Sequence, residues 1–308
     1  METWLIIVSF FVMALMRVVQ KVCSKKVSNA VEGKIFFHYG GYYNLMSALF
    51  SLITLAIVGF YGFDLLTGLC ALATALCLSV ELFASIEALK GASLIVNQMF
   101  SVGALFIPCI VGIFIFNEPM SVWQWIGLAL FAVAMYFMIA QTKVKEKKMS
   151  SKISVKTVVM LILTLIAGGG TMVAQKAFAI IVPNGNVATY SFLMFALNAI
   201  ILYSCYGIMC FRKGKKVAVI GEKTEKKTLS KVLLLCGLIL AFAVFLINIL
   251  VTELGKSVDS AVLFSVSYAI SILITILVGA IYYKEKITPK NVIGILLCVG
   301  ALAMINFL

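Results

Sequence analysis

The chain has 308 residues, of which 63% are hydrophobic and 12% are charged, and its mean hydropathy is +1.12. Because soluble domains have about 45–50% apolar and about 25% charged residues, a soluble fold of this composition would expose large apolar areas to water. The net charge of +13 does not indicate a nucleic-acid partner, since Lys and Arg lie in short runs between long apolar stretches or at their ends, as in membrane proteins.

Ten apolar runs are long enough to cross a membrane, which takes about 20 residues in a helix. Backbone groups in lipid have no water to bind, so these runs are predicted to be helices. The sequence therefore predicts an all-α integral membrane protein of the cytoplasmic membrane with multiple passes. The first run has no basic leader and no small-residue cleavage site, so we expect a retained helix rather than a signal peptide. The predicted spans are 3–22, 42–61, 66–88, 92–117, 122–141, 156–181, 187–211, 232–252, 259–283 and 289–307.

The basic residues predict an orientation. Loops that follow odd-numbered spans hold nearly all Lys and Arg, including the linker KVKEKKMSSK (143–152) and the long polar loop 210–231. Cytoplasmic loops carry the excess of basic residues, so both termini are expected outside. We interpret the basic runs as solvated loops near anionic lipid rather than as binding sites.

The sequence offers no catalytic, metal or cofactor site. Seven of the eight Cys lie within apolar runs, no CxxC occurs, and His38 is the only histidine; buried free Cys usually acts as a small apolar residue. No GxxxxGK[ST] phosphate loop occurs either. These patterns predict that the protein is not an enzyme.

The chain repeats itself. VGIFIFNEPMSVWQWIG (111–127) aligns without a gap with VGAIYYKEKITPKNVIG (278–294), which places Glu118 on Glu285. Gln-Lys and Glu-x-x-Lys pairs precede both segments in the same order, which gives halves 1–142 and 153–308 of five helices each. An odd number of crossings inverts the second half, as in secondary transporters. We interpret Glu118 and Glu285 as helix-boundary residues, favourable near a helix N-terminus.

Five-plus-five helices, a Lys that closes the first helix of each half, and a Glu before a Gly-bearing fifth helix resemble the drug/metabolite transporter superfamily, and within it the EamA-type permeases. The resemblance implies two EamA-like repeats around a central cavity lined mainly by spans 1–4 and 6–9. Spans five and ten would then be peripheral, where relatives often form dimers, so a homodimer is one expectation. Members are often drawn with both termini in the cytoplasm, in conflict with the charge count.

Polar residues inside spans suggest a cavity wall, since polar groups in lipid tend to face the bundle interior. Four- and seven-residue spacings place them on one face of a helix. The alternative is helix–helix contact through small polar residues. Two such stripes occur, Ser93, Asn97 and Ser101 with Gln98 beside them, and Ser260, Ser267, Ser271 and Thr275 with Tyr268 beside them.

Glu81 is the most deeply placed carboxylate and is predicted to bind a cationic substrate or carry a proton. The alternatives are snorkelling to the interface and pairing with Lys90. Gln20 and Gln175 are candidates for hydrogen bonds to substrate. Asn44 and neighbouring tyrosines are placed to gate the cavity or, the preferred interpretation, to form an interfacial belt.

Two lysines, a proline and three glycines within the predicted spans each have two possible roles. Lys21 and Lys176 neutralise buried anions or snorkel. Pro108 and the glycines 168–170 mark hinges or sites of close helix packing.

The predicted function is secondary transport of a small organic metabolite or cation by alternating access, with proton coupling as an option. The alternative is a lipid-linked flippase, or an accessory membrane subunit that moves no soluble solute. The expected partners are a small-molecule substrate and the lipid bilayer.

Overall fold

A computed structural model describes residues 3–28, 30–31, 34–59, 64–117, 120–139, 154–212, 223–283 and 289–307. Within these ranges the protein is built from helices, with no strand. The helices are α1 (Thr3–Ser28), α2 (Lys34–Val58), α3 (Leu65–Gly91), α4 (Leu94–Gly103), α5 (Phe106–Ile115), α6 (Val122–Ile139), α7 (Val155–Ile181), α8 (Val187–Arg212), α9 (Lys223–Leu254), α10 (Ser260–Ile281) and α11 (Pro289–Phe307).

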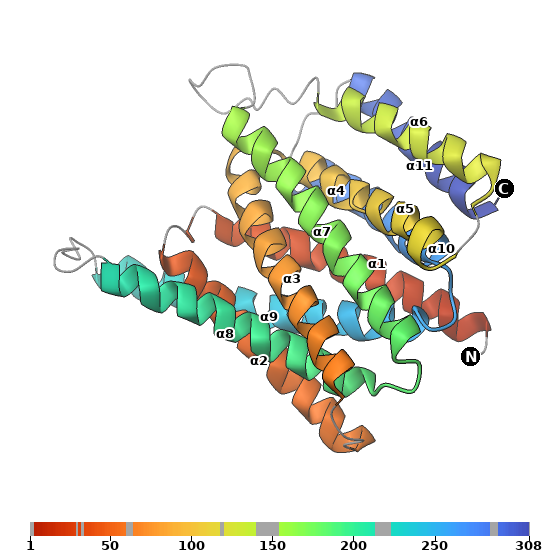
Figure 1. The fold of residues 1–308 in the computed structure, drawn as a ribbon. Helices are drawn as coiled ribbons and strands as arrows, with labels where there is room; N and C mark the ends of the chain where they lie inside the picture. Colours follow the sequence, from red (N-terminus) through yellow and green to blue (C-terminus); the bar gives the residue numbers. More distant parts are fainter. Residues whose placement is uncertain are drawn as a thin grey trace.

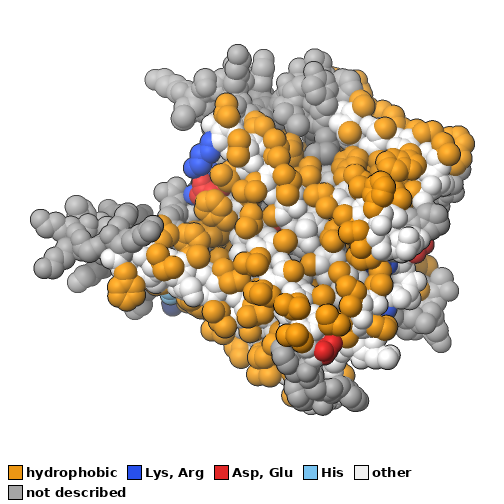
Figure 2. Space-filling model, viewed as in Figure 1, with side chains coloured by type: hydrophobic (Ala, Val, Ile, Leu, Met, Phe, Trp, Pro, Cys, Tyr) orange, Lys and Arg blue, Asp and Glu red, His pale blue; other side chains and the backbone are white. Residues whose placement is uncertain are grey.

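Seven apolar stretches in the described part of the chain are long enough to cross a membrane, with α4 and α5 counted as one. Shorter apolar helical stretches occupy Val122–Ala134, Ile270–Ile281 and Val292–Ala301. Hydrophobic side chains cover most of the face in Figure 2, where charged atoms form only a few small groups. The chain is therefore a membrane protein with several spans.

Several helices extend beyond the predicted apolar runs. The second helix begins at Lys34 rather than near residue 42, and α1 continues to Ser28. The prediction of a loop over 210–231 is wrong for its last part, because α9 already begins at Lys223. Lys and Glu are good helix formers, so a helix can continue past the point where the apolar run ends.

The predicted fourth span is broken, as the proline in it indicated. Proline has no N–H and its ring clashes with the carbonyl four residues earlier, which for Pro108 is that of Ala104. The backbone turns at this point, where the N–H of Leu105 donates to Val102 O at 3.0 Å and that of Ile107 to Ala104 O at 3.2 Å. The chain therefore forms α4 and α5 in place of one helix.

The helices pack mainly in pairs that join the two halves of the sequence. The most extensive pairs are α3 with α7, α2 with α8 and α6 with α11, followed by α1 with α9. In Figure 1 the α6–α11 pair lies at one end of the molecule and the α2–α8 pair lies toward the opposite end. The remaining helices pack between them and position the site.

The three glycines of α7 serve close packing. A Cβ on Gly169 would lie 2.5 Å from Ile107 Cδ1 of α5, and one on Gly170 would lie 2.9 Å from Cys77 Sγ of α3. These distances are shorter than van der Waals contact, so larger residues would push α7 away from α3 and α5. The contacts favour the packing interpretation of residues 168–170.

Three features of the sequence fall on residues outside the described part of the chain. These are Glu118, Glu285 and the linker 143–152. Their roles, the division into halves and the number of membrane crossings stay predictions.

Candidate functional site

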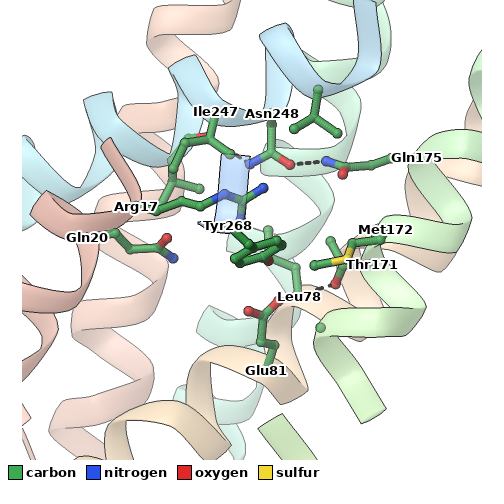
Figure 3. Close-up of a pocket in the computed structure, with 13 residues that line it drawn as sticks. Arg17, Gln20, Leu78, Glu81, Thr171, Met172, Gln175, Ile247, Asn248 and Tyr268 are labelled. Atoms are coloured by element: carbon green, nitrogen blue, oxygen red, sulfur yellow. Dashed lines mark hydrogen bonds between the residues drawn. The ribbon is translucent and has the colours of Figure 1, made fainter. Parts of the chain in front are cut away.

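A polar cavity of about 50 Å³ lies within the bundle, at the boundary between two apolar clusters. This volume has room for a few water molecules. Its walls come from α1, α3, α7, α9 and α10, so both halves of the chain contribute (Figure 3). The polar side chains that line it are Arg17, Gln20, Glu81, Thr171, Gln175, Asn248 and Tyr268.

Helical spacing explains why each helix presents several residues to this cavity. Positions three or four apart share one face of a helix. Thr171 and Gln175 are four apart on α7, and Arg17 and Gln20 are three apart on α1. Of the predicted site residues, the structure brings Gln20, Glu81, Gln175 and Tyr268 together here.

Arg17 is a cavity residue that the sequence analysis did not single out. Its guanidinium carbon lies 3.9 Å from the centre of the Tyr268 ring, a cation–π contact. The side chain is 9% exposed, and its Nε donates to no partner within the described residues. Its position inside an apolar span was the signal available, because charged residues in spans are costly and often functional.

Glu81 extends from α3 toward the cavity (Figure 3). Thr171 Oγ1 of α7 donates to Glu81 Oε2 at 3.5 Å, and Lys21 and Arg17 are close enough to act on this carboxyl electrostatically. Lys90, proposed from the sequence as its partner, forms an ion pair with Glu87. The carboxylate therefore faces cationic side chains of α1.

Gln175 and Asn248 join α7 to α9 on another side of the cavity. The amide of Gln175 donates to Asn248 Oδ1, and Asn248 Nδ2 donates to Val244 O at 2.7 Å (Figure 3). Both residues are buried.

The predicted stripe on the fourth span mainly binds a lysine. Lys21 Nζ donates to Ser85 Oγ at 3.1 Å, to Asn97 Oδ1 at 2.8 Å and to Ser101 Oγ at 2.7 Å. Ser93 instead caps α4, where its hydroxyl accepts from Val96 N at 3.2 Å. Asn97 and Ser101 therefore hold the ammonium of Lys21 and do not line the cavity.

Lys21 is buried and does not snorkel to the membrane surface. Lys176, by contrast, binds the backbone: Lys176 Nζ donates to Val258 O at 2.8 Å, just beyond the end of α9. The two lysines that align in the repeat therefore have different surroundings.

Three other predicted residues lie elsewhere. Gln98 Nε2 donates to Ser271 Oγ at 3.0 Å, which joins α4 to α10. Asn44 lies inside α2 rather than at its start, and its Oδ1 accepts from Asn198 Nδ2 of α8 at 3.1 Å. The contact between Gln98 and Ser271 is the interhelical hydrogen bond given above as the alternative for the stripes. Asn44 is buried and bonded to α8, so it does not lie in an interfacial belt.

Ser267 belongs to α10, but its side chain lies outside the described part of the structure.

Comparison with known proteins places the second half of the chain in a family. The model of the EamA-like transporter family matches residues 155–307, which run from α7 to α11. A solved structure titled "Crystal structure of protein" is 12% identical with a TM-score of 0.64, and the alignment covers 98% of this chain and 96% of that chain. This likeness concerns the fold alone. No curated protein matches the chain.

Proposed function

The chain is a membrane transporter of the EamA-like family, as its match over residues 155–307 shows, and from this premise we propose that it carries a small organic metabolite by alternating access. The substrate occupies the cavity between the two halves of the bundle. The observation that carries the proposal is a polar cavity, lined by side chains of both charge signs, between two apolar clusters of the bundle.

The helix pairs support a two-fold arrangement of ten spans. If α4 and α5 count as one span, the second, fourth and fifth spans of each half pack against their counterparts in the other half. The first span of each half packs against the third span of the other, as α1 does with α9 and α7 with α3. Exchanging the halves leaves this pattern unchanged, as expected of an inverted repeat.

The cavity must widen before it can hold an organic metabolite. About 50 Å³ leaves little room beyond a few waters, whereas ligand sites usually measure about 300–1,000 Å³. Movement of α1 and α3 relative to α7 and α9 would widen the cavity on one side at a time. Arg17, Gln20, Glu81 and Gln175 then face the substrate.

Reconstitution into liposomes tests the function directly. We expect the full chain to exchange labelled small metabolites across the vesicle membrane, and the substitution Glu81→Gln to reduce this exchange at least about tenfold, since it removes the only carboxylate described in the cavity wall. If Glu81 carries a proton, the same substitution abolishes the pH dependence of any remaining flux. Glu253→Gln, at the end of α9 and with a side chain 47% exposed, is the matched control.

Two outcomes would contradict the proposal. Folded protein that exchanges no metabolite from a broad panel, yet moves fluorescent lipids between leaflets, would support the flippase alternative. A Glu81→Gln variant with wild-type flux and wild-type pH dependence would remove Glu81 from the site.

A further inference from the structure

We infer that the substrate is a small organic anion, and that its carboxylate binds the guanidinium of Arg17 in the cavity. The inference rests on the proposed function and gives that function a substrate class. It departs from the sequence-based expectation of a cation, which depended on Glu81 alone.

The charges around the cavity do not balance among the described residues. Arg17 and Lys21 bring two positive charges, and Glu81 brings one negative charge. A net charge inside a bilayer is costly, so a ligand with one negative charge would bring the site close to neutrality. A cation would increase the imbalance.

Lys21 is already coordinated, which leaves Arg17 as the cation available to a ligand. An ammonium group has three donor hydrogens, and the three of Lys21 match its three acceptors, Ser85, Asn97 and Ser101. Its charge therefore acts on the cavity from a fixed position, without a free donor for substrate.

Arg17, unlike Lys21, is held by an aromatic ring rather than by hydrogen-bond acceptors. Contact with the face of the Tyr268 ring, 3.9 Å from the guanidinium carbon, holds the guanidinium in place beside the cavity. The Nε of Arg17 is buried and donates to no described residue, although a buried donor without a partner is costly. A bound anion would supply the missing acceptor.

The geometry favours a carboxylate over a phosphate ester. The planar fork of arginine matches the two oxygens of a carboxylate and can bind both. A phosphate ester carries about −1.5 to −2 charges near neutral pH, which would leave the site negative beside Glu81. The narrow cavity also favours a small ligand.

Two series of molecules with similar shapes and different charges test the inference on the purified full chain. They are propionate, propionamide and propylammonium, and benzoate, benzamide and benzylammonium. We expect the carboxylates to raise the thermal unfolding midpoint at constant ionic strength, and the amides and ammonium ions to have little effect. Charge-assisted hydrogen bonds predict that Arg17→Gln weakens carboxylate binding by at least about tenfold.

Two further variants make the result specific. Arg17→Lys keeps the charge but loses the planar fork, so its carboxylate affinity should lie between those of the wild type and Arg17→Gln. Lys26→Gln removes an exposed positive charge from the same helix and should leave the carboxylate response unchanged. The unfolding midpoint of each variant without ligand shows whether it is folded.

Three results would overturn the inference. They are an ammonium ion that stabilises the wild type as much as the matching carboxylate, a folded Arg17→Gln variant with an undiminished carboxylate response, and no response of the wild type to either carboxylate. Metabolite exchange in liposomes is measured separately. If exchange occurs without a preference for anions, the inference fails and the transport function stands, whereas the absence of all exchange rejects the function itself.

Discussion

Replacing Asn97 by leucine is expected to destabilise the protein more than replacing the lysine that it binds. Asn97 is fully buried, and its Oδ1 accepts from Lys21 Nζ at 2.8 Å and from Ser85 Oγ at 3.2 Å. The substitution leaves the ammonium of Lys21 buried with only two hydroxyl acceptors. Loss of a hydrogen bond to a charged group costs about 1.5–3 kcal/mol and loss of a neutral one about 1 kcal/mol, so we expect the free energy of unfolding to fall by about 2.5–4 kcal/mol.

Lys21→Met should cost less, although it removes three hydrogen bonds. Asn97 Oδ1 then still accepts from Ser85, and the hydroxyl of Ser101 still donates to Asn97 O at 3.2 Å. The variant also has no buried ammonium to desolvate, and Glu81 keeps Arg17 as a cationic neighbour. We expect a loss within about 1 kcal/mol, since the acceptors of Lys21 keep hydrogen bonds to one another and no buried charge is left without a neighbour of opposite sign.

The double variant Lys21→Met with Asn97→Leu gives the decisive comparison. It should be more stable than Asn97→Leu alone, with a coupling energy of at least about 1 kcal/mol. Equilibrium unfolding by SDS in mixed micelles, followed by circular dichroism, measures all four proteins. The reasoning is refuted if Asn97→Leu is as stable as the wild type, or if the two single losses add in the double variant.

Two further substitutions are predicted for the same assay. Gly169→Ala should lower the free energy of unfolding by about 1–3 kcal/mol, because the added Cβ overlaps the Ile107 side chain of α5. Gly207→Ala is the control: no atom lies within 4 Å of its added Cβ, so this substitution should be neutral or stabilising. Equal effects of the two substitutions would contradict the packing assigned to residues 168–170. Glu87→Gln removes two ion pairs, one to Lys90 in the same helix and one at 3.1 Å to Lys156, whose side chain is 70% exposed. Since a surface pair contributes about 0.2–1 kcal/mol, a loss of about 0.4–2 kcal/mol that shrinks in high salt is expected. Glu253→Gln, which breaks an ion pair between the last turn of α9 and Lys256 in the turn that follows it, is its control, and a loss above about 2 kcal/mol for Glu87→Gln would show that its contacts are more than surface pairs.

Polar residues in the spans could be recognised from the sequence, but their partners could not. Four of the ten predicted site residues line the cavity, because a polar side chain in an apolar helix tends to face the bundle interior. The spacing of Asn97 and Ser101 correctly placed them on one buried face. It could not show that Lys21, on a helix far away in the sequence, occupies that face.

Arg17 is a second residue whose partner could not be predicted from the sequence. Its position inside an apolar span marked it as unusual, but only the tertiary structure showed that its guanidinium meets the Tyr268 ring of α10.

The sequence by itself determined the membrane environment, the helices and the family, because hydrophobic length and composition act locally along the chain. The break between α4 and α5 also follows from a local cause, the missing N–H of Pro108. The tertiary structure alone decided which charges meet. Lys21 is held by three neutral oxygens, while the buried Nε of Arg17, beside the cavity, has no acceptor among the residues that the structure describes. Electrostatic partners in a helical bundle are set by packing between helices that are far apart in the sequence.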